Sequence, residues 1–207
     1  EIRIDRPDAA GIGEVCFRGA TVFGGYYRSE AETRRVFDAE GWFHTGDLGR
    51  LSPDGFLYLT GRIKDVIVLD SGKNVYPDEI EEYYLTHSTL IEEIGIVGIP
   101  RGGNEIVAGV LVPSKDLRRR HTLEEAQPVL RAELARLGQG LPSYKKLSEF
   151  RLSYHALPRT STRKLRKPDL KRRFLESGAG GGAVEKLTVA ELEAMNSAEF
   201  RKIAKYL

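Results

Sequence analysis

One stretch, residues 61–82, most constrains what this chain can fold into. It opens with charged residues, and its apolar run at residues 66–69 is rich in β-branched side chains, which favour a strand. Residues 70–74 have the composition of a turn, and Pro77 with the acidic residues after it predicts the first turn of a helix. A charged strand–turn–helix of this kind occurs in many soluble proteins. By its periodicity alone, the stretch predicts local structure and no particular function.

The composition is typical of a soluble globular chain. Its 207 residues suffice for one large or two small domains, and 32 basic against 30 acidic residues exclude a strongly charged protein. No apolar run approaches the roughly 20 residues of a membrane helix, and the first residues resemble no signal or transit peptide. The single cysteine, Cys16, excludes an internal disulfide and indicates a buried, unreactive thiol, so a reducing cytoplasm is the expected location.

Residues 1–61 are expected to be mainly β-structure without a complete core of their own. Residues 13–19 alternate apolar and polar side chains, as a half-buried strand does, and residues 30–37 carry a short helical pattern. Two strand-like runs, 48–51 and 56–60, flank a Pro-Asp-Gly turn and predict a hairpin. Because the chain begins in strand-like sequence without Met, we expect it to be part of a longer protein.

Residues 62–176 are expected to form a small α+β domain with three strands. The predicted strands are residues 94–99, ended by Pro100, residues 105–113 and residues 147–154, with a turn at residues 101–104.

A helix is predicted over residues 122–137, where Thr122 and Glu125 form a capping box. Pro128 either kinks this helix or moves its start to residue 128. Residues 177–207 predict a Gly-rich linker followed by a short helical tail.

Residues 159–173 hold eight basic residues and one acid. Three interpretations are open: a solvated basic face, a nucleic-acid-binding surface, and a loop that presents a lysine to phosphate chemistry. Nucleic-acid binding also calls for aromatic side chains for stacking, and Phe174 is the only one nearby. Metal binding is not predicted anywhere, because the histidines lack ligand spacing and suit polar surface or core positions; they are His44, His87, His121 and His155.

Four segments together resemble one known family: residues 42–48 (WFHTGDL), 61–64 (GRIK), 72–81 (GKNVYPDEIE) and 158–166 (PRTSTRKLR). They are similar to motifs of the AMP-forming acyl-CoA synthetases, in the adenylate-forming superfamily. The resemblance covers about residues 11–175, with further matches at residues 13–37 and 141–145. It implies that residues 1–61 are the β-rich end of a large N-terminal domain and that residues 62–176 are the small, mobile C-terminal domain.

The resemblance also implies roles for individual residues. Asp47, Arg62 and Lys164 would bind ATP or AMP, with Asp47 on the ribose hydroxyls, since one carboxylate can accept from a vicinal diol. Lys164 would be the catalytic lysine of adenylation, because a mobile cation can bridge the attacking carboxylate and the phosphate. Lys64 would be the hinge of the small domain. The segment that carries Lys164 departs from the family pattern at Arg163, where the family usually has glycine. This difference puts the path of the Lys164 loop in question.

The wall of the coenzyme A channel would be the turn Ser71, Gly72, Lys73 and Asn74. One extra residue between Lys64 and Gly72 resembles the long-chain fatty acyl-CoA ligase branch. The implied partners are a fatty or other carboxylic acid, ATP with Mg²⁺, coenzyme A and the rest of the N-terminal domain; nucleic acid is not among them. No transmembrane segment is expected, although peripheral membrane contact stays open.

The phosphate loop, adenine pocket, magnesium ligand and acyl tunnel of such enzymes belong to sequence absent from this chain. The isolated chain is therefore expected to be inactive and to bind nucleotide weakly or not at all. Two alternatives remain: an acyl-AMP ligase that delivers to the phosphopantetheine of a carrier protein, and a non-enzymatic module that binds phosphate or nucleic acid through residues 159–173.

Overall fold

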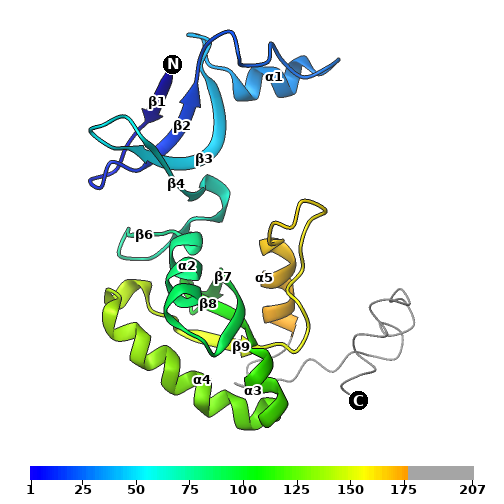
Figure 1. Cartoon of the computed structure of the whole chain (residues 1–207). Coiled ribbons are helices and arrows are strands. Elements are labelled where there is room, and N and C mark those ends of the chain that lie inside the picture. The colour runs from blue at the N-terminus through cyan, green and yellow to red at the C-terminus, as the bar shows by residue number, and fades with distance from the viewer. Residues whose placement is uncertain (177–207) are drawn as a thin grey trace.

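The computed structural model describes residues 1–176 and shows two larger sheets that follow one another along the chain, with a small two-stranded sheet between them in sequence (Figure 1). The first is a four-stranded antiparallel sheet in the order β1-β2-β3-β4, and the second is a three-stranded sheet in the order β7-β8-β9, with helices packed on it. The predicted α+β class is therefore confirmed. The predicted division into domains at residues 61 and 62 stays a prediction, and the predicted linker and tail lie outside the described residues.

The first sheet has few buried side chains. Its elements are β1 (Ile2–Asp5), β2 (Gly13–Phe17), α1 (Glu30–Val36), β3 (Phe43–Leu51) and β4 (Leu57–Arg62). The predicted hairpin between β3 and β4 is confirmed, with Gly55 in the left-handed region at φ +83°. The buried apolar residues among residues 1–63 are Val15, Cys16, Trp42 and Leu48, so the expectation of an incomplete core is confirmed.

The second sheet is buried on both faces. Its strands are β7 (Ile91–Arg101), β8 (Asn104–Pro113) and β9 (Glu149–Leu152), and its helices are α2 (Pro77–His87), α3 (Lys115–Arg120), α4 (Leu123–Leu137) and α5 (Lys167–Glu176). Successive side chains of a strand point to opposite faces. Ile94 and Ile96 therefore pack with α2 and α4, whereas Val97 and Ile99 pack with α5. All three strands were predicted, and β9 is shorter than expected and lies parallel to β8.

Pro100 does not end its strand, which corrects the prediction. β7 continues to Arg101, where it pairs with Asn104 across a two-residue turn. Gly102 and Gly103, at φ +59° and +90°, supply the two left-handed residues that such a tight hairpin turn requires. Because β7 lies at the edge of the sheet, the missing N–H of proline removes no hydrogen bond to a neighbouring strand.

Helix α4 confirms the predicted capping box and excludes the predicted start at Pro128. It begins at Leu123, directly after Thr122, whose side chain accepts from the backbone N–H of Glu125 while the Glu125 side chain accepts from that of Thr122. Pro128 lies inside the helix. The cap and the buried apolar side of the helix, which includes Leu130, outweigh the hydrogen bond that the proline removes.

The basic segment 159–173 is not one loop. Its second half belongs to α5, which buries Leu170 and Phe174 against β7 and β8 and leaves Arg172 exposed. Gly95 on β7 leaves the room for this contact, since a Cβ there would lie 2.5 Å from Leu170 Cδ1. Only the part before Lys167 remains a hairpin loop.

A short connection joins the two sheets. The 3-10 turn η1 (Ile63–Asp65) follows β4, and the two-stranded ladder of β5 (Ile67–Val68) and β6 (Asn74–Val75) leads into α2. The Tyr76 hydroxyl at the start of α2 donates to Asp8 Oδ2 in the loop between β1 and β2, at 2.9 Å. Burial and the Asp8 carboxylate raise the pKa of Tyr76 to about 12, so this hydroxyl stays a donor.

Candidate functional site

Asp47 and Arg62 lie directly opposite each other on β3 and β4. Arg62 Nε is 2.8 Å from Asp47 Oδ1, and both side chains are 41% exposed. Thr45 holds the backbone beneath them, because its hydroxyl donates to the Val15 carbonyl and accepts from the Asp47 N–H. A half-exposed carboxylate beside a guanidinium can accept from hydroxyl groups and attract an anion at the same place. The structure thus brings together two of the three residues predicted to bind nucleotide.

Lys64 lies in η1, two residues after Arg62, and its side chain is exposed. The flanking Arg62 and Val66 have extended backbones. Its predicted role as a hinge stays a prediction.

The predicted channel residues, Ser71 to Asn74, are exposed; the first three lie in the turn between β5 and β6, and Asn74 begins β6. Gly72 has φ +71°, and its N–H donates to the Leu69 carbonyl at 2.8 Å. A Cβ at Gly72 would meet nothing within 4 Å, so the glycine serves the turn conformation in this structure. Lys73 Nζ lies 4.4 Å from the centre of the Tyr144 ring.

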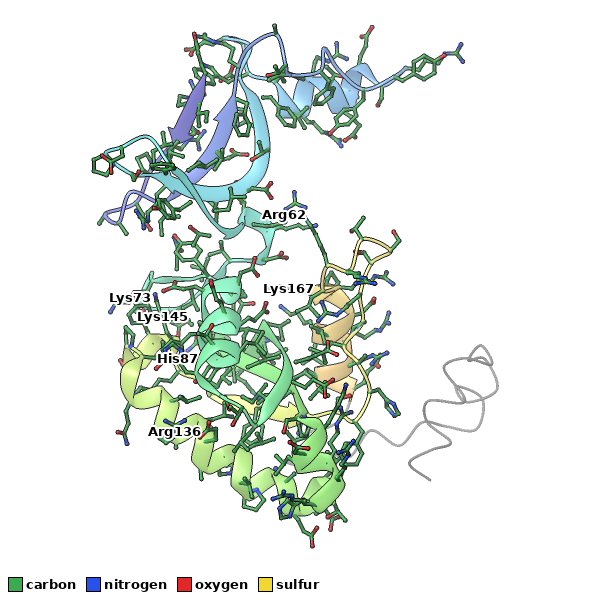
Figure 2. All side chains as sticks on the ribbon, in the orientation of Figure 1. Arg62, Lys73, His87, Arg136, Lys145 and Lys167 are labelled. Atoms are coloured by element: carbon green, nitrogen blue, oxygen red, sulfur yellow. The ribbon has the colours of Figure 1, made fainter. Side chains whose placement is uncertain are left out.

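Lys164 lies in an exposed hairpin that leads into α5. The N–H of Thr160 donates to the Lys164 carbonyl at 2.8 Å, and the Lys164 N–H donates to the Thr160 hydroxyl at 3.1 Å. Among residues 1–176, no hydrogen bond or ion pair is described between this hairpin and the Asp47–Arg62 pair. The hairpin and the glycine turn are also separate: Lys167, at the base of the hairpin, and Lys73 lie on opposite sides of α2 (Figure 2).

The backbone at Arg163 shows how the Lys164 hairpin turns without the glycine that the family usually has there. It has φ +64°, so an arginine adopts the left-handed backbone that glycine favours, and the turn of the loop closes with a hydrogen bond from the Arg163 N–H to the Thr160 carbonyl. The conformation costs an L-residue about 1–2 kcal/mol.

Arg163→Gly is therefore expected to raise the free energy of unfolding. Relief of the left-handed backbone outweighs the entropy that glycine loses on folding, about 0.5–1 kcal/mol, which leaves a gain of about 0.5–1 kcal/mol. Urea unfolding of the chain measures it. Thr162→Gly is the matched control in the same turn: Thr162 is outside the left-handed region, so this change should only destabilise. An equal loss in both variants would contradict the strain at Arg163.

One cluster of possible metal ligands lies elsewhere in the described residues: Glu14, Cys16 and His44 on β2 and β3, with ligand atoms within 4.8 Å of one another. His44 Nδ1 is 2.7 Å from Glu14 Oε2, and Glu14 Oε1 accepts the Gly46 N–H, so the carboxylate is already satisfied. Burial raises the pKa of the Cys16 thiol. A protonated thiol and an imidazole do not fit Mg²⁺, which prefers oxygen ligands, so the cluster is not a magnesium site.

His44 is expected to make stability depend on pH. Hydrogen bonding to Glu14, and to a lesser extent to Asp38, raises the pKa of His44 above 6.5. Its stabilisation is therefore complete below about pH 6.5 and is lost as the pH rises through the folded-state pKa. In urea unfolding, His44→Gln should lower the free energy of unfolding more at about pH 6 than at about pH 9. His87→Gln, on an exposed face of α2, is the control; the same cost of His44→Gln at both pH values would contradict the ion pair.

Sequence reasoning missed one ion-pair cluster, in which Lys167 and Glu81 are largely buried and Asp78 is half-exposed. Lys167 Nζ lies 2.6 Å from Asp78 Oδ1 and 3.1 Å from Glu81 Oε1. From the sequence, the acidic residues after Pro77 indicate only the first turn of a helix. The spacing of Asp78 and Glu81, three residues apart, was the available signal, since such residues share a helix face.

No protein-family model matches the chain. The long-chain-fatty-acid–CoA ligase ACSBG1 of Bos taurus is 46% identical over 101 residues, which are 49% of this chain and 14% of the relative. The medium/long-chain-fatty-acid–CoA ligase FadD8 of Mycobacterium tuberculosis is 33% identical over 171 residues, 82% of this chain and 28% of the relative. The homologues of this chain are acyl-CoA synthetases, and it corresponds to their C-terminal part.

A solved structure agrees with this assignment. The o-succinylbenzoate–CoA synthetase of Bacillus subtilis, in complex with its acyl-adenylate intermediate, superimposes with a TM-score of 0.66 at 29% identity. The match covers 88% of the present chain and 34% of the synthetase chain. The chain thus spans about a third or less of the relatives it matches. In its described part no helix has the length and apolar character needed to cross a membrane.

Proposed function

We propose that the chain is the C-terminal part of an ATP-dependent acyl-CoA ligase that activates a carboxylic acid, in particular a fatty acid. The observation that carries the proposal is the pairing of Asp47 with Arg62 in a homologue of acyl-CoA synthetases. In the first step a carboxylate oxygen attacks the α-phosphorus of ATP, which forms acyl-AMP and releases pyrophosphate. In the second, the sulfur of coenzyme A attacks the acyl carbon, AMP leaves, and the thiol proton passes to solvent.

Each predicted site residue has a task in this proposal. Asp47 accepts hydrogen bonds from the ribose hydroxyls, and Arg62, beside it, contacts the ribose or a phosphate. Lys164 carries a positive charge to the oxygens on which negative charge builds during adenylation. The small domain then turns about Lys64 and presents Ser71 to Asn74 to the pantetheine of coenzyme A. Mg²⁺ would neutralise the phosphates, held by residues outside this chain.

The surface of the first sheet supports the idea that it packs on further protein. Most of the exposed large apolar side chains belong to residues 1–68, among them Phe23, Tyr27, Phe56 and Leu59. Unpaired apolar surface of this kind favours a covered face. Cys16 is a free, buried thiol, which suits the proposed cytoplasmic location.

The experiment uses the enzyme that contains this chain. Wild type should catalyse acid-dependent ATP–pyrophosphate exchange and form a thioester with coenzyme A, whereas thioester formation only with a carrier-protein phosphopantetheine would favour the carrier-protein alternative. Asp47→Ala should weaken ATP binding about ten- to hundredfold, the loss of charge-assisted hydrogen bonds. Asp54→Ala, in the exposed turn between β3 and β4, is the matched control. Equal ATP affinity in all three proteins would overturn the role of Asp47.

A further inference from the structure

The hairpin that carries Lys164 is short and mostly exposed. Its ladder is a single bridge between Arg159 and Leu165, supported by the Arg166 N–H, which donates to the Pro158 carbonyl at 2.9 Å. An isolated hairpin is marginally stable in water at best. Something outside the hairpin must therefore hold it if its lysine is to occupy a defined position.

Arg159 ties the first strand of the hairpin to the large β7–β8 hairpin. Its Nη2 donates to Glu93 Oε2 on β7 at 2.7 Å, and its Nη1 donates to the carbonyl of Arg163 at 2.9 Å. One planar guanidinium thus joins the second sheet to the residue immediately before Lys164. A lysine has a single nitrogen and could not span both acceptors in the same way.

Lys167 ties the other end of the hairpin to α2. Its side chain is 12% exposed, and it bridges Asp78 and Glu81. Glu81 is itself held, because its Oε1 accepts the Ile96 N–H at 2.7 Å. Asp78 also borders the first sheet: a Cβ on Gly61, the residue before Arg62, would lie 3.5 Å from Asp78 Oδ2.

We propose that Arg159 and Lys167 are positioning residues that hold the Lys164 hairpin at its two ends, on β7 and on α2. Neither residue touches the reacting atoms in this proposal. They remove conformational freedom from the loop, so that the ammonium group of Lys164 is presented from a rigid frame and less order is lost when the substrates bind. The effect on catalysis rests on the proposed function, whereas the anchoring is a property of the chain itself.

Hydrogen exchange on the chain tests the anchoring directly. Arg159→Met removes the forked contact and keeps much of the side-chain length; Arg159 is on the surface, so the fold should survive, as circular dichroism would show. By NMR, the amide protons of Arg163 and Lys164 should exchange about tenfold faster. Arg172→Met, on the exposed face of α5, is the matched control and should leave both rates unchanged. Unchanged exchange in Arg159→Met overturns the proposal.

Lys167 is tested with two variants because its loss leaves the mostly buried Glu81 carboxylate without its cation. Lys167→Met should speed exchange at Lys164 about tenfold, and Lys167→Arg, which keeps the charge, should restore protection. If Lys167→Met does not fold, the double variant Lys167→Met with Glu81→Gln removes the buried charge and carries the same expectation. Full protection in a folded variant without the Lys167 ammonium overturns the anchor on α2.

Kinetics in the enzyme that contains the chain separate this proposal from the proposed function. Arg159→Met should lower kcat for acyl-AMP formation about tenfold with KM for ATP nearly unchanged, because the binding groups Asp47 and Arg62 stay in place. Thioester formation from supplied acyl-AMP should be unaffected, and Arg159→Lys should recover part of kcat. Faster exchange in a protein whose wild type forms no acyl-AMP would overturn the proposed function while supporting the anchors.

Discussion

Replacing Lys164 by alanine in the enzyme that contains this chain is expected to reduce acyl-AMP formation by about 10²–10³-fold, the usual effect of removing one group that stabilises developing charge in a transition state. Lys164 lies at an exposed hairpin and is not part of the packed core, so the fold should be unaffected. The measurement is acid-dependent ATP–pyrophosphate exchange. The 207-residue chain alone should show no exchange, because the adenine pocket and the phosphate loop are expected outside it.

The second half of the reaction supplies the internal control. Lys164→Ala should form thioester from supplied acyl-AMP at the wild-type rate, since the glycine turn at Ser71 to Asn74, on the other side of α2, is proposed to serve that step. Arg172→Ala, a charge removal on the exposed face of α5, should change neither step. Equal losses of both steps in Lys164→Ala would contradict the proposed division of labour between the two loops.

Replacing Phe174 by alanine is expected to lower the free energy of unfolding by about 3–5 kcal/mol, the usual cost of removing a buried aromatic ring. Phe174 is 2% exposed, packs on the α5 face of the second sheet, and has the Arg151 guanidinium 4.8 Å from its ring centre. The measurement is urea unfolding of the chain at constant pH.

Leu175, the next residue on the same helix, is the matched control because it is 46% exposed. Leu175→Ala should change stability by no more than about 0.5 kcal/mol. A similarly small effect of Phe174→Ala would mean that residues 167–176 are the solvated basic segment that composition allowed, and that α5 is not docked on the sheet.

Helix α5 also shows where sequence reasoning failed. Its apolar residues, Leu170 and Phe174, are four apart and surrounded by basic residues, so the segment resembled a basic loop. Their helical spacing became decisive only because β7 and β8 offer an apolar face, with Gly95 leaving the space for Leu170. The prediction that a strand ends at Pro100 failed for a similar reason, since the effect of a proline depends on whether its strand is an edge strand.

Two features that the sequence predicted correctly are stabilised by neighbours in the chain. The capping box of Thr122 and Glu125 and the two-glycine turn after Arg101 are local, and both occur as predicted. For the candidate site, the family resemblance predicted Asp47 and Arg62 as partners of one ligand. That they face each other across β3 and β4 depends on the register of that hairpin, which shifts between Leu48 and Gly49 and could not be predicted.

By itself, the sequence determined the α+β class, the local turns and caps, and the motifs that relate this chain to acyl-CoA synthetases. Only the tertiary structure decided that Lys167 joins Asp78 and Glu81 and that Arg159 and Lys167 connect the lysine hairpin to β7 and α2. The physical reason is distance along the chain. Caps and turns are stabilised within a few residues, whereas these ion pairs join groups 66 to 89 residues apart, whose meeting depends on how the whole sheet and its helices pack.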